Sequence, residues 1–270
     1  MGFLGVIAAA AFVTLYGLAL ATSPTAAART LAATLPVLTD LDQALVAHAD
    51  AVMESARAGV ESVAIPGLPL PVTVPREAAL AGGDTLRRAA VDAALREVYG
   101  GGHAVFRAPD APPARQPTPL STEWVVQRTL DLLTRATHTR LSTLGGVSGV
   151  ALLALLGLLV LQVEGRRRPM ALGSVLVAGA IIAALGALLA RGGVWLFTSG
   201  DDDVVSRVAA RTARDLTFTV AAAAGVVGAA GVLGAAIGSA VLRLGAGSPA
   251  GRRGRTRAPA PAAREPWEEA

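Results

Sequence analysis

The chain has 270 residues, of which 53% are hydrophobic and 16% are charged. In ordinary globular domains about 45–50% of the residues are hydrophobic and about 25% are charged, so this composition argues against a soluble fold. The formal net charge is +4 and cysteine is absent, which excludes disulfides, thiolate nucleophiles and cysteine metal sites. Lysine is also absent and alanine and glycine are frequent, a bias typical of GC-rich bacterial genomes.

Four blocks without charged side chains hold most of the hydrophobic excess: Gly2–Thr22, Leu144–Val163, Met170–Ala190 and Leu216–Leu242. Each has about the 20 residues that a helix needs to cross a hydrocarbon core of roughly 30 Å. The predicted fold class is therefore an all-α membrane bundle of about four transmembrane helices. A small domain, α/β or mostly α, is inserted between the first and second spans.

The predicted organisation places an extracytoplasmic domain and several loops between the spans. In chain order the predicted segments are a first anchor (1–22), the extracytoplasmic domain (23–143) with a proline-rich connector (108–119), a second span (144–163), a cytoplasmic arginine loop (164–169), a third span (170–190), an outer loop with an amphipathic helix (191–215), a fourth span (216–244) and a disordered basic tail (245–270). The first apolar block is longer than a typical signal sequence and has no positive N-terminal region, so we favour an uncleaved anchor. Cleavage after Ala21 would leave three spans in the same orientation.

Arginines beside the spans predict the orientation. Short cytoplasmic loops are enriched in arginine and lysine, and the segment between the second and third spans contains Arg166, Arg167 and Arg168. The segment after the fourth span contains Arg252 and Arg253. Both segments are therefore predicted to lie in the cytoplasm of a cell-membrane protein, with 23–143 outside. Because the arginines adjoin spans, the basic charge does not indicate a nucleic-acid partner.

The inserted domain begins with the pattern of an amphipathic helix between Leu38 and Val63, where apolar residues recur at steps of three and four. Ile65–Pro75 has a proline every few residues, which excludes a helix and favours an extended edge strand or a polyproline segment. Its residues Leu68, Leu70 and Val72 are candidate contacts for a protein partner. A second helix is predicted from Asp84, a good N-cap, to Tyr99.

The rest of the domain leads back to the membrane. The segment from His103 to Arg107 is predicted to form one short strand. Apolar residues from Val126 to Leu144 share one helical face, and no helix breaker precedes Gly145. One continuous helix is therefore predicted to run from Ser121 or Thr122 into the second span.

Small residues in the spans predict close helix packing, because they let helix backbones approach each other in lipid. The candidates are Gly145, Gly149, Gly231, Gly234 and Gly238. Packing within one chain is favoured, and association into a homo-oligomer stays open. Gly146–Gly149 (GVSG) resembles the G-x-S-G of rhomboid intramembrane proteases, but no histidine lies in a span to take the serine proton. We interpret these residues as part of a helix crossing.

Before the fourth span, Asp201–Asp203 favours a helix N-terminus, where acidic groups complement the helix dipole. Arg207, Arg211 and Arg214 follow at helical steps. These arginines are candidate contacts for lipid phosphates, and an ordinary solvated face is an equal alternative.

The sequence also limits the function. Ion and proton pathways usually need ionisable groups at membrane depth, and the four blocks contain no charged residue. The three histidines, His48, His103 and His138, have no nucleophile or paired carboxylate at a recognisable spacing. No catalytic residue, cofactor or metal ligand is predicted. We expect a non-enzymatic protein whose outer domain binds a protein partner, as a scaffold, assembly factor or accessory subunit. A signalling component with a separate cytoplasmic partner is the alternative, and a membrane-bound enzyme ranks third.

Overall fold

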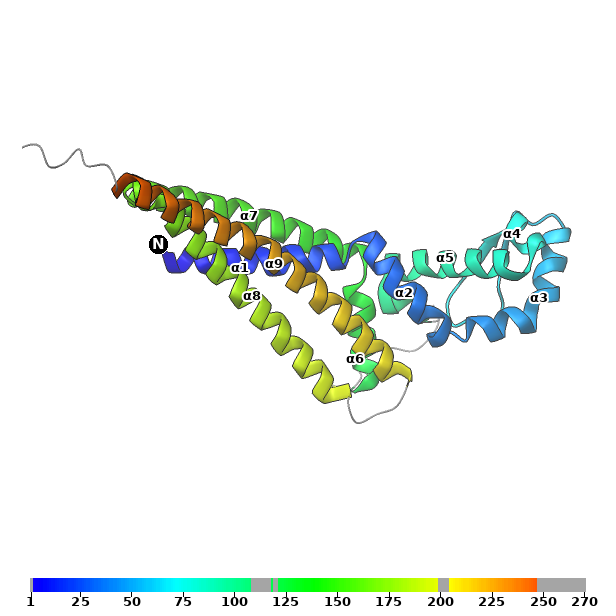
Figure 1. Cartoon of the computed structure of the whole chain (residues 1–270). Coiled ribbons are helices and arrows are strands. Elements are labelled where there is room, and N and C mark those ends of the chain that lie inside the picture. The colour runs from blue at the N-terminus through cyan, green and yellow to red at the C-terminus, as the bar shows by residue number, and fades with distance from the viewer. Residues whose placement is uncertain (1, 108–117, 119–120, 199–203, 247–270) are drawn as a thin grey trace, which may run out of the picture.

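The computed structural model describes residues 2–107, 118, 121–198 and 204–246. These residues are mostly helical, with four long helices in a bundle and a smaller domain beyond one end of it (Figure 1). The long helices are α1 (Gly2–Ala21), α7 (Arg135–Gln162), α8 (Arg168–Thr198) and α9 (Val204–Ala246). Each contains a segment long and apolar enough to cross a membrane, as expected of a multi-pass membrane protein.

The domain between α1 and α7 consists of short helices and a single antiparallel hairpin. Its elements are α2 (Pro24–Leu38), α3 (Leu41–Arg57), β1 (Ser62–Ala64), β2 (Thr73–Pro75), α4 (Arg76–Ala81), α5 (Gly83–Gly101), the 3₁₀ helix η1 (Gly102–Phe106) and α6 (Thr122–Leu132). In the hairpin Val63 lies opposite Val74, and both side chains are buried.

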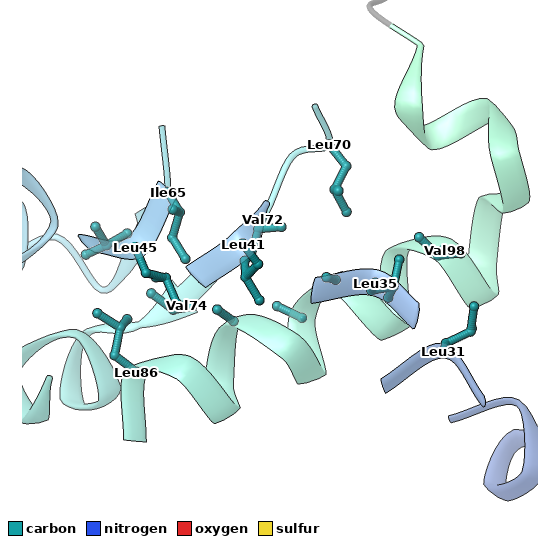
Figure 2. Close-up of a cluster of buried hydrophobic side chains, with 14 of the residues drawn as sticks. Leu31, Leu35, Leu41, Leu45, Ile65, Leu70, Val72, Val74, Leu86 and Val98 are labelled. Atoms are coloured by element: carbon teal, nitrogen blue, oxygen red, sulfur yellow. The ribbon is translucent and has the colours of Figure 1, made fainter. Parts of the chain in front are cut away.

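The core of this domain lies where α2, α3 and α5 meet the hairpin (Figure 2). Each helix contributes apolar side chains at steps of three or four, and the hairpin contributes alternate residues because strand side chains alternate between faces. The labelled core residues are Leu31, Leu35, Leu41, Leu45, Ile65, Leu70, Val72, Val74, Leu86 and Val98. The domain therefore has its own hydrophobic core, separate from the packing of the bundle.

Several predicted elements of the domain differ in the structure. Helix α5 confirms the prediction for 84–99, but the helical pattern of 38–63 is interrupted at Asp40, which has a left-handed φ of 47°, and α3 ends at Arg57. The short strand predicted for 103–107 is wrong, because these residues belong to η1 or follow it. Helix α2 has no counterpart in the sequence prediction. It begins where the Ser23 side chain accepts a hydrogen bond from the Ala26 N–H.

The helices near the membrane are also arranged differently from the prediction. The continuous helix predicted into the second span is wrong, because the chain breaks at Leu133 and Thr134 between α6 and α7. The Thr134 hydroxyl caps α7 by accepting a hydrogen bond from the Thr137 N–H. In the segment predicted as an outer loop with an amphipathic helix (191–215), the helix agrees with α9, which begins at Val204, but α8 continues to Thr198 where a loop was predicted.

In the bundle, α1 contacts all three other long helices. Gly5, Ala9, Val13 and Gly17 are buried and recur every four residues, so they form one stripe of mostly small side chains. A Cβ added to Gly17 would lie 2.8 Å from the Cα of Val220 on α9. Because Cβ atoms essentially never lie this close to another heavy atom, the two backbones can cross only where α1 has glycine. Small residues thus set the position of α1.

The outer face of the bundle is apolar. Leu153, Leu161, Leu189 and Phe218 expose between 70 and 77% of their surface. Soluble proteins rarely expose contiguous apolar surface on this scale, whereas lipid tails cover it without cost. The exposed side chains therefore agree with the membrane assignment of the four helices.

One bidentate ion pair joins α3 to α5 on the surface of the domain. The Arg87 Nε donates to Asp42 Oδ1 over 2.6 Å, and a terminal nitrogen of Arg87 donates to Oδ2 over 3.0 Å. The hydrogen bond from Arg87 lowers the pKa of Asp42 below its ordinary value. A lowered carboxyl pKa stabilises the fold above the unfolded pKa, and this contribution is lost as the pH falls through the folded pKa. Both side chains are about half exposed, so water screens the effect.

Candidate binding site

Two hollows in the surface of the domain adjoin at Leu38, the last residue of α2. We call the first the His103 hollow. It has a volume of about 380 Å³ and is lined by Leu38, His103, Phe106, Glu123, Val126, Gln127 and Leu130. Its floor is apolar and its rim carries an imidazole, a carboxylate and an amide. An apolar floor with a few polar groups is the usual composition of a ligand or partner pocket.

His103 is held in place by Asp131 of α6. The Nδ1 atom of His103 lies 2.7 Å from Asp131 Oδ1, and the same oxygen accepts the backbone N–H of His103 over 3.2 Å. These two contacts fix η1 against α6 and orient the imidazole on the rim. The nearby hydroxyls of Thr134 and Thr137 donate to the Asp131 carbonyl instead of facing His103. The pair can therefore orient a hydrogen bond to a ligand, and within the described part of the chain no hydroxyl is hydrogen-bonded to the imidazole.

We call the second hollow the Asp40 hollow. Its volume is about 310 Å³, and it lies between the start of α3 and the turn of the hairpin, lined by Leu38, Thr39, Asp40, Gln43, Ala44, Ala47, His48, Gly67 and Pro69. Gly67 has φ +80°, and a Cβ there would lie 2.7 Å from His48 Nε2. Only glycine therefore lets the hairpin turn approach the imidazole. This hollow is more polar than the first.

The hairpin residues predicted to meet a partner have a different position. Leu70 is 3% exposed and Val72 is 1% exposed, and Leu68 packs against the same core. Leu70 and Val72 therefore stabilise the core and are not accessible to a partner, whereas Leu68 is half-buried. Prolines near them predicted an exposed edge, but the chain folds back on itself, with the Ile65 N–H donating to the Val72 carbonyl.

The predicted glycines lie at helix crossings within one chain. Gly145 and Gly149 of α7 face α1, where added Cβ atoms would approach the backbone of Tyr16 and the ring of Phe12. Gly231, Gly234 and Gly238 of α9 face α8. Gly173 and Gly179 of α8 and Gly17 of α1 were not predicted, yet they are tighter than Gly145 and Gly234, where the nearest atoms to an added Cβ lie 3.6 and 3.9 Å away. The four-residue stripe in α1 was the signal that could have identified Gly17.

The predicted arginines fall into three groups. Arg167 and Arg168 are exposed between α7 and α8, at the end of the bundle away from the domain (Figure 1). Arg211 and Arg214 are exposed on α9. The side chains of Arg166 and Arg207 lie outside the described part of the structure, as do Asp201–Asp203, the proline-rich connector except Thr118, and the tail with Arg252 and Arg253.

The three histidines occupy separate places. His48 lies against the hairpin turn, His103 pairs with Asp131, and His138 Nδ1 lies 3.0 Å from the Ala19 carbonyl at the end of α1. Among the described residues no group of three histidine or acidic side chains could hold a metal ion. The His103–Asp131 pair joins residues 28 positions apart, so only the tertiary fold could reveal it.

No family model matches the chain, and no curated protein or solved structure matches it. The site must therefore be interpreted from its own chemistry.

Proposed function

We propose that the chain is a non-enzymatic, multi-pass protein of the cell membrane whose domain lies outside the cytoplasm and binds a protein partner. The His103 hollow carries the proposal. Protein interfaces combine an apolar centre with a polar rim, and this hollow has an apolar floor beside His103, Glu123 and Gln127. The Asp40 hollow continues the surface past Leu38. A scaffold, assembly or accessory-subunit role follows from binding without chemistry.

The arrangement of the helices supports the proposed orientation. The domain and the Arg167–Arg168 loop lie at opposite ends of the bundle (Figure 1), so arginines in the cytoplasm require the domain to be outside. The burial of Gly5, Ala9, Val13 and Gly17 within the bundle supports retention of α1 as an anchor. A cleaved α1 would leave its partners on α8 and α9 uncovered.

The orientation can be tested with introduced cysteines, because the chain has none of its own. Arg88→Cys is placed on an exposed position of α5, and Arg167→Cys on the exposed loop. An impermeant thiol reagent added to intact cells is expected to label position 88 and to reach position 167 only after the membrane is opened. Labelling at 167 in intact cells, with 88 protected, would reverse the orientation.

Partner binding is tested by site-specific photo-crosslinking in native membranes. A benzophenone amino acid at Gln127 or Gln43, one in each hollow, is expected to give the same discrete product. The same group at Arg96, an exposed residue of α5 that lines neither hollow, should give none. A product of equal yield at all three positions, or none at any, would contradict the proposed site.

A matched pair of charge reversals sharpens this test. Glu123→Arg places a positive charge on the rim of the His103 hollow, whereas Glu97→Arg makes the same change on an exposed position of α5. Charge reversal at an interface rim slows association and disfavours a complementary partner. We expect Glu123→Arg to reduce the crosslink from Gln43 several-fold and Glu97→Arg to leave it unchanged. Equal effects of the two substitutions would argue against recognition at this rim.

A signalling role is the second candidate, and one observation favours it. Helix α9 contacts α2 and α6 of the domain and is continuous to Ala246. A displacement of the domain could therefore reach the opposite end of the bundle through α9. The break between α6 and α7 removes the other direct helical route. This candidate needs a cytoplasmic partner that senses the position of α9.

A further inference from the structure

A cavity within the bundle lies between α1, α8 and α9, near the end that faces the domain. Its volume is about 450 Å³, and its walls include Leu18, Ile182, Ala187, Leu216 and Val220. It forms because α8 diverges from α1 towards its C-terminal end (Figure 1), and because the α8 residues that line it are, apart from Ile182, alanine and glycine. We call this space the bundle cavity.

The size and chemistry of the bundle cavity limit its occupant. Apolar cavities do not hold ordered water, which needs two to four polar partners. A helix is at least about 10 Å across, so 450 Å³ corresponds to roughly 6 Å of helix, or about four residues. A whole transmembrane helix of a partner therefore does not fit inside it. A thin, flexible hydrocarbon chain from the surrounding bilayer does.

A second, polar hollow adjoins the bundle cavity at Leu216, which lines both. Its volume is about 300 Å³, and it contains Arg29 and Thr30 of α2 and Asp215 and Thr219 of α9. We call it the Arg29 hollow. Asp215 precedes the apolar block that begins at Leu216, and Ala21 at the end of α1 also lines the hollow. This position corresponds to the level of lipid headgroups.

The Arg29 hollow presents one positive and one negative side chain. Within the described residues, neither Arg29 nor Asp215 forms an ion pair, with each other or with a third group. Both side chains are exposed. A purely anionic headgroup would gain from Arg29 but would be repelled by Asp215. A headgroup with a phosphate and a primary ammonium matches both, since each charge gains a charge-assisted hydrogen bond.

We propose that these two hollows together bind one zwitterionic aminophospholipid, such as phosphatidylethanolamine, from the outer leaflet. Its phosphate contacts Arg29, its ammonium contacts Asp215, and one acyl chain passes Leu216 into the bundle cavity. The proposal rests on the membrane placement of the four helices and, for the choice of leaflet, on the proposed orientation. It is independent of partner binding at the His103 hollow. On this proposal, α8 diverges from α1 because the space between them holds an acyl chain.

The test uses the full chain in detergent with added phosphatidylethanolamine, phosphatidylcholine or phosphatidylglycerol, and reads binding by native mass spectrometry and by thermal stabilisation. Phosphatidylethanolamine is expected to bind roughly five- to tenfold more tightly than the other two. Phosphatidylcholine tests the hydrogen bond from the ammonium to Asp215, because its quaternary nitrogen has no hydrogen to donate. Equal binding of all three lipids would overturn the proposal.

Two headgroup variants are expected to change the preference in different ways. Asp215→Asn should remove the discrimination against phosphatidylglycerol, whereas Arg29→Gln should weaken binding of every phospholipid. Both positions are exposed, so neither substitution disturbs a core. An unchanged lipid preference in both variants would contradict the assigned contacts.

The acyl-chain site is tested with Gly186→Leu, which projects into the bundle cavity from α8. No atom lies within 4 Å of a Cβ added at Gly186, and the same is true of Gly157 on α7, which lines no part of the cavity. Gly157→Leu is therefore a matched control. We expect Gly186→Leu to lose phosphatidylethanolamine binding and Gly157→Leu to retain it. If both variants retain phosphatidylethanolamine binding, the acyl chain does not occupy the bundle cavity.

A protein that stays soluble without detergent would instead refute the membrane placement of the four helices.

Discussion

Replacing Gly173 with leucine is expected to force α8 and α9 apart and to lower the melting temperature of the detergent-solubilised protein by roughly 10 °C. A Cβ at position 173 would lie 2.5 Å from the Gly231 carbonyl oxygen and 2.7 Å from the Ala235 nitrogen. Both atoms belong to the backbone, so no side-chain rotation can relieve the overlap. Overpacking of this kind costs about 3 kcal/mol or more when neighbours cannot move.

The matched control for this substitution is Gly225→Leu on α9, where no atom lies within 4 Å of the added Cβ. The melting temperature of this variant should equal that of the parent protein, because leucine is as apolar as the surrounding lipid. Gly234→Leu should have a smaller effect than Gly173→Leu, since the nearest atom to a Cβ at Gly234 is 3.9 Å away. A Gly173→Leu variant as stable as the parent would show that α8 and α9 do not cross at this position.

Leu41→Ala is expected to destabilise the domain by about 2–5 kcal/mol. Leu41 begins α3 and is 1% exposed within the core formed with the hairpin and α5. Truncation removes buried methyl groups and leaves a cavity, and the domain is small enough that this cost is a large share of its stability.

The effect can be measured by hydrogen exchange on the full chain. Amides of α5 and β2 should exchange roughly thirtyfold faster or more in Leu41→Ala, if exchange proceeds through opening of the domain. Val46→Ala on the same helix is the control, because Val46 is 82% exposed. Faster exchange in α8 and α9 as well would show that the domain and bundle open together, contrary to their separate cores.

The sequence predicted the long helices well because the signal for a span is local. Twenty apolar residues without charge are sufficient to identify it, and the blocks Gly2–Thr22 and Leu144–Val163 need no tertiary information. The central place of α1 could not be predicted in the same way. It depends on Gly17 meeting Val220, a contact between residues about 200 positions apart.

The domain was harder to predict because short-range signals were ambiguous there. Pro36 lies inside α2, and proline ordinarily argues against a helix, so α2 was missed. Thr134 ends one helix and caps the next, although nothing in the apolar periodicity marks a break. The prolines of Ile65–Pro75 were correctly taken to exclude a helix, but the burial of Leu70 and Val72 depends on the core that the hairpin covers.

The candidate site could be predicted only in part. His103 was considered with the other two histidines, but Asp131 was not connected with it because the two residues meet only when η1 packs against α6. Arg29 was not singled out at all. Its hollow exists because α2 packs beside α9, which no pattern in either helix indicates.

The position of α1 has a consequence for biogenesis. Helix α1 leaves the ribosome before α7, α8 and α9, yet its contacts with α9 cannot form until α9 has been synthesised and inserted. During that interval α9 does not yet pack against the stripe of small residues from Gly5 to Gly17. Domains generally fold as units during synthesis, so the domain between α1 and α7 can complete its own core before the bundle closes. Insertion of α9 is therefore the step that commits the chain to its final assembly.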